Sequence, residues 1–376
     1  MMGCSFHKQA NDRLPCIDVS KNYPEKEILL TDIADVTYLH LNTDNSDYLY
    51  KSRFGSVGIS ENLVIISDIS SGSILFFSRD GNPVSRFNRY GNGAGEYPFT
   101  DPSFFYDNTS NEIFVNVFDI IHVYAPSGEY KRKLTLPTRN AQILNYDDQS
   151  IFVRDMQIDY NQLSEIETDF SSHPSDSSYF RISKTDGKVL EYVIRPRNII
   201  DFTISEYGGE IISRNSYSYM EKSADGLLLC NPKTDTVFLY AKDRTLTPVF
   251  CKTPLVSKLD PMVVLTDFVD AGKYQFMKIK TNVGILKRKE YPDKYYLRDK
   301  QTNEIFRQKL ILPDYPEKEF FISGHNASFK QARFELDLIE LKQAYKENKL
   351  SGKLKDLVAT LNENKDNNVY VVAKFK

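Results

Sequence analysis

The chain has 376 residues, a formal net charge of −3 and 41% hydrophobic residues. Such a length and apolar content can bury a sizeable core, which excludes a disordered chain. The small negative charge leaves no basic footprint, so nucleic acid is excluded as a partner. No aliphatic run approaches the roughly 20 residues that a membrane span needs. Tyr and Phe contribute 24 residues each, and this aromatic content favours strands.

The first residues place Cys4 after Gly3 and before a polar stretch. This arrangement resembles the end of a bacterial lipoprotein signal, in which the cysteine becomes the lipidated N-terminus after cleavage. The charged and apolar parts of such a signal do not precede it, and Met2 stands where a small residue is usual. Either the sequence starts downstream of the true start, which we expect, or the resemblance is accidental. We therefore expect residues 1–24 to be a leader or linker with Cys4 as the lipidation site.

Strands are expected first at residues 28–30 and 36–41, and a recurring phrase then follows. The phrase consists of an apolar run, a polar turn, a second apolar-aromatic run and a turn that ends in glycine. Its first two copies contain Gly81 and Gly128, which lie 47 residues apart. Apolar runs separated by such turns are typical of β-hairpins. A third copy begins at Ile151, and looser copies begin at Leu227 and Tyr274.

The repeat predicts the fold. A period of about 45 to 60 residues with roughly four strands per copy is typical of β-propeller blades, which stack around an axis to bury their faces. The sequence therefore predicts an all-β, six-bladed β-propeller as a single domain over residues 25–376. A polar insertion at residues 159–178 interrupts the third copy and is expected to be a loop on one face.

The last 50 residues change in character. Apolar residues at helical spacing predict two amphipathic helices within about residues 327–363, packed as a cap on the propeller: Phe334, Leu338, Leu341 and Tyr345, then Leu354, Leu357, Val358 and Leu361. Residues 369–375 return to strand composition. We expect this strand to close the ring by pairing with residues 36–41.

The hairpin phrase, the glycine-rich stretch 90–97 and the final strand resemble the six-bladed β-propeller lipoproteins of gut Bacteroidetes, which are related to NHL-repeat propellers. The resemblance covers most of the chain and is strongest over residues 28–136. Ala94 stands where that family usually has proline. The resemblance implies a lipid-anchored protein of the bacterial cell envelope, in the periplasm or on the outer-membrane surface. Most of that family has no established activity, so no mechanism is implied.

Two patterns could be taken for sites. The run 91–95 is neither GxGxxG nor GxxxxGK[ST], and no helix can open after it, so it predicts a connection between blades. Asp68, Asp119 and Asp155 recur beside the hairpin strands and would suit calcium if they converged on the axis. Aspartate is also the ordinary turn residue, and recurrence in every copy favours that role. No metal site is therefore predicted.

Arginine can bind carboxylates and tyrosine can stack on flat ligands. On this ground the candidate ligand-binding residues at the channel mouth are Arg154, Asp155, Arg214 and Tyr217, with ordinary strand-surface residues as the alternative. The cysteines form no CxxC pair or zinc spacing. Cys230 and Cys251 lie in neighbouring strand-like segments; two buried thiols are expected, and a bridge between them is left open.

No short histidine spacing, HExxH or GxSxG motif occurs. The sequence thus predicts an extracytoplasmic propeller that binds a small ligand, either a glycan or a peptide, or an envelope protein, without catalysis. Its membrane contact would be through the lipid anchor. The first alternative is a propeller hydrolase or lyase that uses carboxylates, and a divalent metal such as calcium, at the channel mouth. A scaffold that binds partners through the 159–178 loop and the C-terminal helices is a further alternative. No cofactor is predicted.

Overall fold

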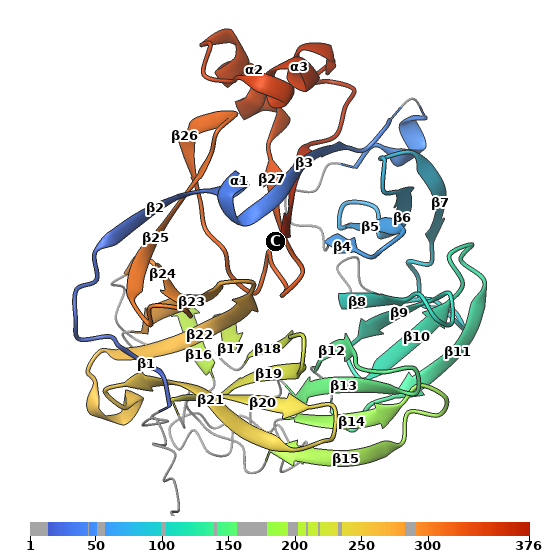
Figure 1. Ribbon diagram of the computed structural model, residues 1–376. Helices are drawn as coiled ribbons and strands as arrows, with labels where there is room; N and C mark the ends of the chain where they lie inside the picture. Colours follow the sequence, from blue (N-terminus) through green and yellow to red (C-terminus); the bar gives the residue numbers. More distant parts are fainter. Residues whose placement is uncertain are drawn as a thin grey trace, which may run out of the picture.

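The computed structural model describes residues 14–43, 45–50, 57–98, 103–138, 141–155, 179–194, 202–207, 210–216, 219–231, 235–282 and 291–376. Six sheets stand around a common centre, as Figure 1 shows, and a separate two-stranded sheet lies beside them. The predicted all-β, six-bladed propeller is therefore confirmed.

Three blades are continuous in sequence, and their strands follow one another outward from the centre (Figure 1). Blade 1 comprises β4 (Val57–Ile59), β5 (Leu63–Asp68), β6 (Ser73–Ser78) and β7 (Pro83–Asn88). Blade 2 comprises β8 (Ser103–Asp107), β9 (Glu112–Val117), β10 (Ile120–Tyr124) and β11 (Tyr130–Thr135). Blade 3 comprises β12 (Ala141–Asn145), β13 (Ser150–Asp155), β14 (Tyr179–Ser183) and β15 (Val189–Ile194).

The other blades include strands from the N-terminal part of the chain. Blade 4 comprises β18 (Tyr219–Lys222), β19 (Gly226–Asn231), β20 (Thr236–Ala241), β21 (Leu246–Thr253) and β1 (Cys16–Asp18). Blade 5 comprises β22 (Met262–Ala271), β23 (Tyr274–Asn282), β24 (Lys294–Asp299), β25 (Ile305–Leu312), β26 (Tyr315–Phe320) and β2 (Glu25–Leu29). Blade 6 comprises β27 (Gln331–Leu336), β28 (Val369–Phe375) and β3 (Ala34–His40). The separate sheet comprises β16 (Phe202–Tyr207) and β17 (Glu210–Ser216).

The sequence repeat coincides with the second and third strands of each blade. Its copies fall on β5–β6, β9–β10, β13–β14, β19–β20 and β23–β24. Nearly every residue of β5, β6 and β9 is buried, because these strands are covered on both faces by the neighbouring blades. The repeat therefore marks the second and third strands of a blade rather than the innermost one. The innermost strands lie one position earlier in the chain and carry a weaker apolar pattern.

The recurring glycine packs each blade against the one before it. Gly81, Gly128 and Gly187 all have φ between +73° and +88°, a backbone conformation that favours glycine. A Cβ on Gly128 would lie 2.5 Å from Phe87 of blade 1, and one on Gly187 would lie 3.2 Å from Leu134 of blade 2. The glycines that revealed the repeat thus fit the close approach of successive blades.

The C-terminal strand closes the ring. β28 pairs antiparallel with β3 over seven residues, with Val371 opposite Tyr38 and Ala373 opposite Val36. This is the predicted closure, and it unites the two ends of the sequence in blade 6. The first predicted strand is displaced slightly: β2 ends at Leu29, and Leu30 begins the one-turn helix α1 (Leu30–Ile33).

A second link fixes the N-terminal part to blade 4. β1 pairs in parallel with β21, and Cys16 forms a disulfide with Cys251 across this pair, with Cα atoms 4.4 Å apart. The expectation of two buried thiols at Cys230 and Cys251 was therefore wrong for Cys251, whereas Cys230 is a buried free thiol. Cys16 lies in the segment that the sequence analysis assigned to a leader or linker, so it was not expected to pair with Cys251. The pairing of β1 with β21, which are far apart in the chain, brings the two cysteines together. Part of that segment, residues 16–18, is an outer strand of the propeller.

The C-terminal helices cap blades 5 and 6, as predicted. They are α2 (Leu338–Lys346) and α3 (Gly352–Thr360), and Figure 1 shows them together at the outer end of β26 and β27. Leu341 and Val358 lie in one apolar cluster with strand residues of both blades. The predicted helical region was too long at its start, because residues 331–336 form β27 with alternating burial. The described residues also include the short 3₁₀ helices η1 (Ser46–Tyr48) and η4 (Val256–Lys258).

The glycine-rich stretch connects blades 1 and 2, as predicted. Gly93 N–H donates to Glu96 Oε2 at 2.8 Å, and the Tyr124 hydroxyl donates to the Gly95 carbonyl at 3.1 Å. These hydrogen bonds pair polar atoms of the loop with other groups of the same protein.

In the part of the chain described above, the helices are too short and too polar to cross a bilayer.

Candidate functional site on the inner strands

Of the four residues predicted to line the channel mouth, the structure describes the side chains of Arg154 and Asp155. Arg154 and Asp155 end β13, the second strand of blade 3, and both are at least nine-tenths buried. Asp155 Oδ1 accepts a 2.6 Å hydrogen bond from the Thr138 hydroxyl. Arg214 lies in β17, but its side chain is outside the described residues, as is Tyr217. Cys4 and the 159–178 insertion are also outside them.

The three recurring aspartates have separate surroundings. Asp68 accepts hydrogen bonds from Ser70 and Ser71 in the turn that follows it, which confirms the turn role there. Asp119 lies in the β9–β10 turn, where its carbonyl accepts from Leu136 N–H. Within the described ranges, no group of three His, Cys, Asp or Glu residues could hold a metal ion.

A different group of polar residues lies on the innermost strands of blades 4, 5 and 6. We call it the inner-strand cluster, and it comprises Tyr219 and Glu221 on β18, Asp267 on β22 and Arg333 on β27. Tyr219 and Asp267 are buried, whereas Glu221 and Arg333 keep part of their surface accessible. β18 and β22 are in contact, so the cluster joins neighbouring blades.

Asp267 is the most unusual member of the cluster. Its side chain is 3% exposed, and its Oδ2 atom is buried without a hydrogen-bond partner among the residues that the structure describes. Burial raises the pKa of this carboxyl, although the positive charges of His325, Lys278 and Arg154 oppose the rise. A buried carboxylate oxygen without a partner is costly, and an ion, a water or a ligand usually supplies the partner.

A β-bulge sets the direction of Asp267. The register between β22 and β23 shifts between Leu265 and Asp267, so Thr266 is an extra residue in the strand. Leu265 and Phe268 consequently pack into the same apolar cluster although they are three residues apart. Bulges re-aim side chains and are common beside functional sites. The bulge therefore places an acidic side chain within a strand whose other residues are largely apolar.

The Glu221 carboxyl group has a pKa near neutral pH. Burial raises its pKa to about 7, against the opposing effects of the Lys222 N–H, the Tyr219 hydroxyl and the Arg333 charge. The Tyr219 hydroxyl donates to Glu221 Oε2 at 3.3 Å, and Lys222 N–H donates to Oε1 at 2.9 Å. A carboxyl group with this pKa can donate or accept a proton at physiological pH.

The loop before β27 completes the cluster. A Cβ on Gly324 would lie 2.2 to 2.4 Å from the Tyr219 ring, so only glycine permits the ring to rest on this backbone. Arg333 donates a 3.2 Å hydrogen bond to the carbonyl of His325 in the same loop. Tyr219 of blade 4 therefore contacts the chain segment that leads into blade 6.

Two basic residues on the second strands of their blades, Arg154 on β13 and Lys278 on β23, lie near the cluster. Arg154, one of the residues predicted from sequence, lies near enough to lower the pKa of Asp267. Lys278, the cross-strand partner of Asp267, forms an ion pair with Asp293 at 2.9 Å. Of the four predicted residues, Arg154 is thus connected to the cluster, whereas Asp155 bonds elsewhere.

Sequence reasoning missed Asp267, Glu221 and Arg333. The usable signal was an acidic residue inside the strand-like run Met262–Ala271, because aspartate is disfavoured within strands unless it has a special role. The contacts with β18 and with the loop before β27 carried no sequence signal, since these segments are far apart in the chain.

The fold defines this protein as a closed six-bladed propeller with polar and charged residues on three inner strands. Residues 6–221 match the family DUF5128, whose description is "6-bladed beta-propeller". The chain belongs to this family.

Solved structures from Bacteroides species are similar to this chain. A Bacteroides fragilis protein inferred to be exported matches with a TM-score of 0.63 and 16% identity, over 97% of this chain and 100% of that one. A DUF4221 family member from Bacteroides vulgatus matches with a TM-score of 0.47 and 13% identity, over 92% of this chain and 97% of that one. At these identities the likeness concerns the fold alone. No protein with a curated description matches the chain.

Proposed function

We propose that this protein is an exported, lipid-anchored propeller that binds a small polar ligand at the inner-strand cluster without transforming it. The unpartnered Oδ2 of Asp267 carries this proposal. A ligand that offers a hydroxyl or amine hydrogen to this oxygen would offset its burial, as glycans and peptides can. Tyr219 lies near Asp267, and Arg333, near Glu221, adds a guanidinium donor to the cluster.

The proposed location outside the cytoplasm has its own support. Disulfides persist in oxidising compartments, and Cys16–Cys251 is a disulfide between distant segments. The similar Bacteroides fragilis protein is inferred to be exported. Cys4 would carry the lipid, as the sequence pattern predicts. Mass spectrometry of the protein from its native membrane, compared with a Cys4→Ala variant, would test the anchor directly.

Ligand binding is tested by calorimetry with glycan and peptide panels at pH 7. We expect the panels to contain a ligand that binds the wild type. Its affinity for Asp267→Asn should be at least about tenfold lower, because the amide replaces one acceptor oxygen of the carboxylate with an NH2 donor. Asp225→Asn, a change at an exposed aspartate in the β18–β19 turn, is the matched control and should bind normally. Equal affinity for all three proteins would contradict the assignment of the site.

A second function, acid–base catalysis, is favoured by one observation. Glu221, whose pKa is raised to about 7, and the buried Asp267 are two carboxyl groups with perturbed proton affinity in one cluster. A propeller hydrolase or lyase would use such a pair. If the bound ligand is converted by the wild type, and Glu221→Gln binds it equally but does not convert it, the protein is an enzyme. An unchanged ligand after prolonged incubation supports binding alone.

A further inference from the structure

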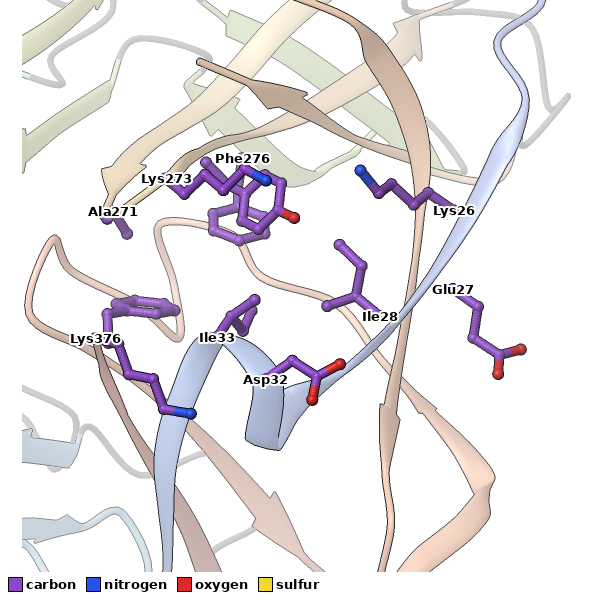
Figure 2. Close-up of a pocket in the computed structure, with 12 residues that line it drawn as sticks. Lys26, Glu27, Ile28, Asp32, Ile33, Ala271, Lys273, Phe276 and Lys376 are labelled. Atoms are coloured by element: carbon purple, nitrogen blue, oxygen red, sulfur yellow. The ribbon is translucent and has the colours of Figure 1, made fainter. Parts of the chain in front are cut away.

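A pocket of about 350 Å³ lies between blades 5 and 6, and none of its lining residues belongs to the inner-strand cluster. Figure 2 shows its lining, which comes from β2, α1, the β22–β23 turn, the start of β23 and the end of β28. Its volume is within the range of small-molecule sites. Segments from both ends of the sequence therefore build it.

One part of the lining is apolar and flat. The Phe276 and Phe375 rings are stacked, with centroids 6.0 Å apart and planes 22° apart. Ile28 and Ile33 lie on the other side of the same pocket (Figure 2). Phe375 and Ile33 are only partly buried, so they keep apolar surface that a ligand could cover.

A second part of the lining is cationic. Lys26 and Lys273 both lie in the upper part of the view in Figure 2, with their ammonium groups turned toward each other. Both pair with the buried carboxylate of Asp299, at 3.8 Å and 3.0 Å. Both ammonium groups also lie near the Tyr274 ring, 5.6 Å and 5.4 Å from its centroid. Two positive charges share one carboxylate, so this wall keeps one unbalanced positive charge.

The opposite wall is balanced. The Lys376 ammonium donates to the Thr31 carbonyl at 2.7 Å, and Asp32 lies on the same side of the pocket (Figure 2). Glu27 points away from the pocket and pairs with Lys309 at 3.2 Å. The attraction for an anion is therefore confined to the wall of Lys26 and Lys273.

We propose that this pocket binds an aromatic carboxylate, with its ring against Phe375 and Ile33 and its carboxylate between the ammonium groups of Lys26 and Lys273. A carboxylate gains charge-assisted hydrogen bonds from both lysines. A neutral aromatic compound gains only the apolar contact. This site is independent of the inner-strand cluster and of the function proposed for it.

Calorimetry and ligand-observed NMR with phenylacetate test this site in the full chain at low salt. A ligand of this size should bind with a dissociation constant of about 1 mM or tighter. The neutral analogue 2-phenylethanol should bind at least about tenfold more weakly. Lys273→Gln should weaken phenylacetate binding by a similar factor. Lys300→Gln removes a turn lysine of the same blade that pairs with Asp270, and this matched control should bind normally.

Ile33→Trp fills the apolar part of the pocket and should abolish phenylacetate binding. The thermal unfolding midpoint of this variant is measured to show that it is folded. Asp267→Asn should bind phenylacetate as the wild type does, which separates this site from the inner-strand cluster. The proposal is overturned if phenylacetate shows no saturable binding at about 10 mM. It is also overturned if 2-phenylethanol binds equally well, or if Lys273→Gln and Lys300→Gln behave alike.

Discussion

The hydroxyl groups of Tyr50 and Tyr370 lie 2.7 Å apart and share a hydrogen bond, although the two residues are 320 positions apart in the chain. Tyr370 lies on the closing strand β28, and Tyr50 lies just after η1 on the way to blade 1. Both side chains are in one apolar cluster with Val64 and Phe77 of blade 1. The ring closure therefore has a buried polar contact in addition to the β28–β3 pairing.

Tyr370→Phe should lower the free energy of unfolding by about 1–2 kcal/mol, because it leaves the buried Tyr50 hydroxyl without its partner. Urea denaturation measures the change. Tyr130→Phe is the control, since Tyr130 is 37% exposed, and it should change stability by less than about 0.5 kcal/mol. If the two variants are equally stable, the hydroxyl pair contributes nothing to closure.

Loss of the Cys16–Cys251 disulfide should release β1 from β21 and cost about 2–5 kcal/mol of stability, because the bridge joins residues 235 positions apart. Cys16→Ser, Cys251→Ser and the double variant should be destabilised by nearly the same amount, since each breaks the same bond. Dithiothreitol should lower the urea midpoint of the wild type and leave that of the double variant unchanged. A fully reduced wild type with an unaltered midpoint would refute this role.

The raised pKa of Glu221 predicts a specific pH dependence of stability. The folded protein holds this proton up to about pH 7, whereas the unfolded chain releases it near the ordinary glutamate pKa of 4.5. The folded state thus binds more protons between these values, so stability should fall as pH rises from about 4.5 to 7. Glu221→Gln should flatten this part of the profile, as measured by urea denaturation at each pH. Glu61→Gln, at a side chain that is 77% exposed, should retain the wild-type slope.

Asp107 and Asp267 are both buried aspartates, but their substitution should have opposite consequences. Asp107 pairs with the buried Lys184 at 2.7 Å, so Asp107→Asn leaves a buried ammonium without its charge partner and should cost about 3–5 kcal/mol. Asp267→Asn removes a carboxylate whose Oδ2 lacks a partner, so the ligand-free protein should be unchanged or up to about 2 kcal/mol more stable. Thermal and urea unfolding distinguish these outcomes. A large loss of stability in Asp267→Asn would mean that its carboxylate is structural.

Particular residues explain how much of the candidate site was predictable. Arg154 was chosen because arginine in a strand can bind anions, and it does lie near Asp267. Asp155 was chosen by its neighbourhood in sequence, yet consecutive strand residues point to opposite faces, and its carboxylate bonds to Thr138. Glu221 and Arg333 share no sequence pattern, because their proximity arises only when blades 4 and 6 close around the centre.

The sequence by itself determined the propeller, its six blades, the closing strand and the helical cap. Strands buried on both faces need continuous apolar runs, and the turns between them need glycine, so the repeat is visible in the chain. The tertiary structure alone decided that Cys16 is the partner of Cys251, that the repeat marks the second and third strands, and which polar residues meet at the centre. These relationships depend on contacts between distant segments, which leave no local pattern. The same is true of the pocket where β2 and the end of β28 come together.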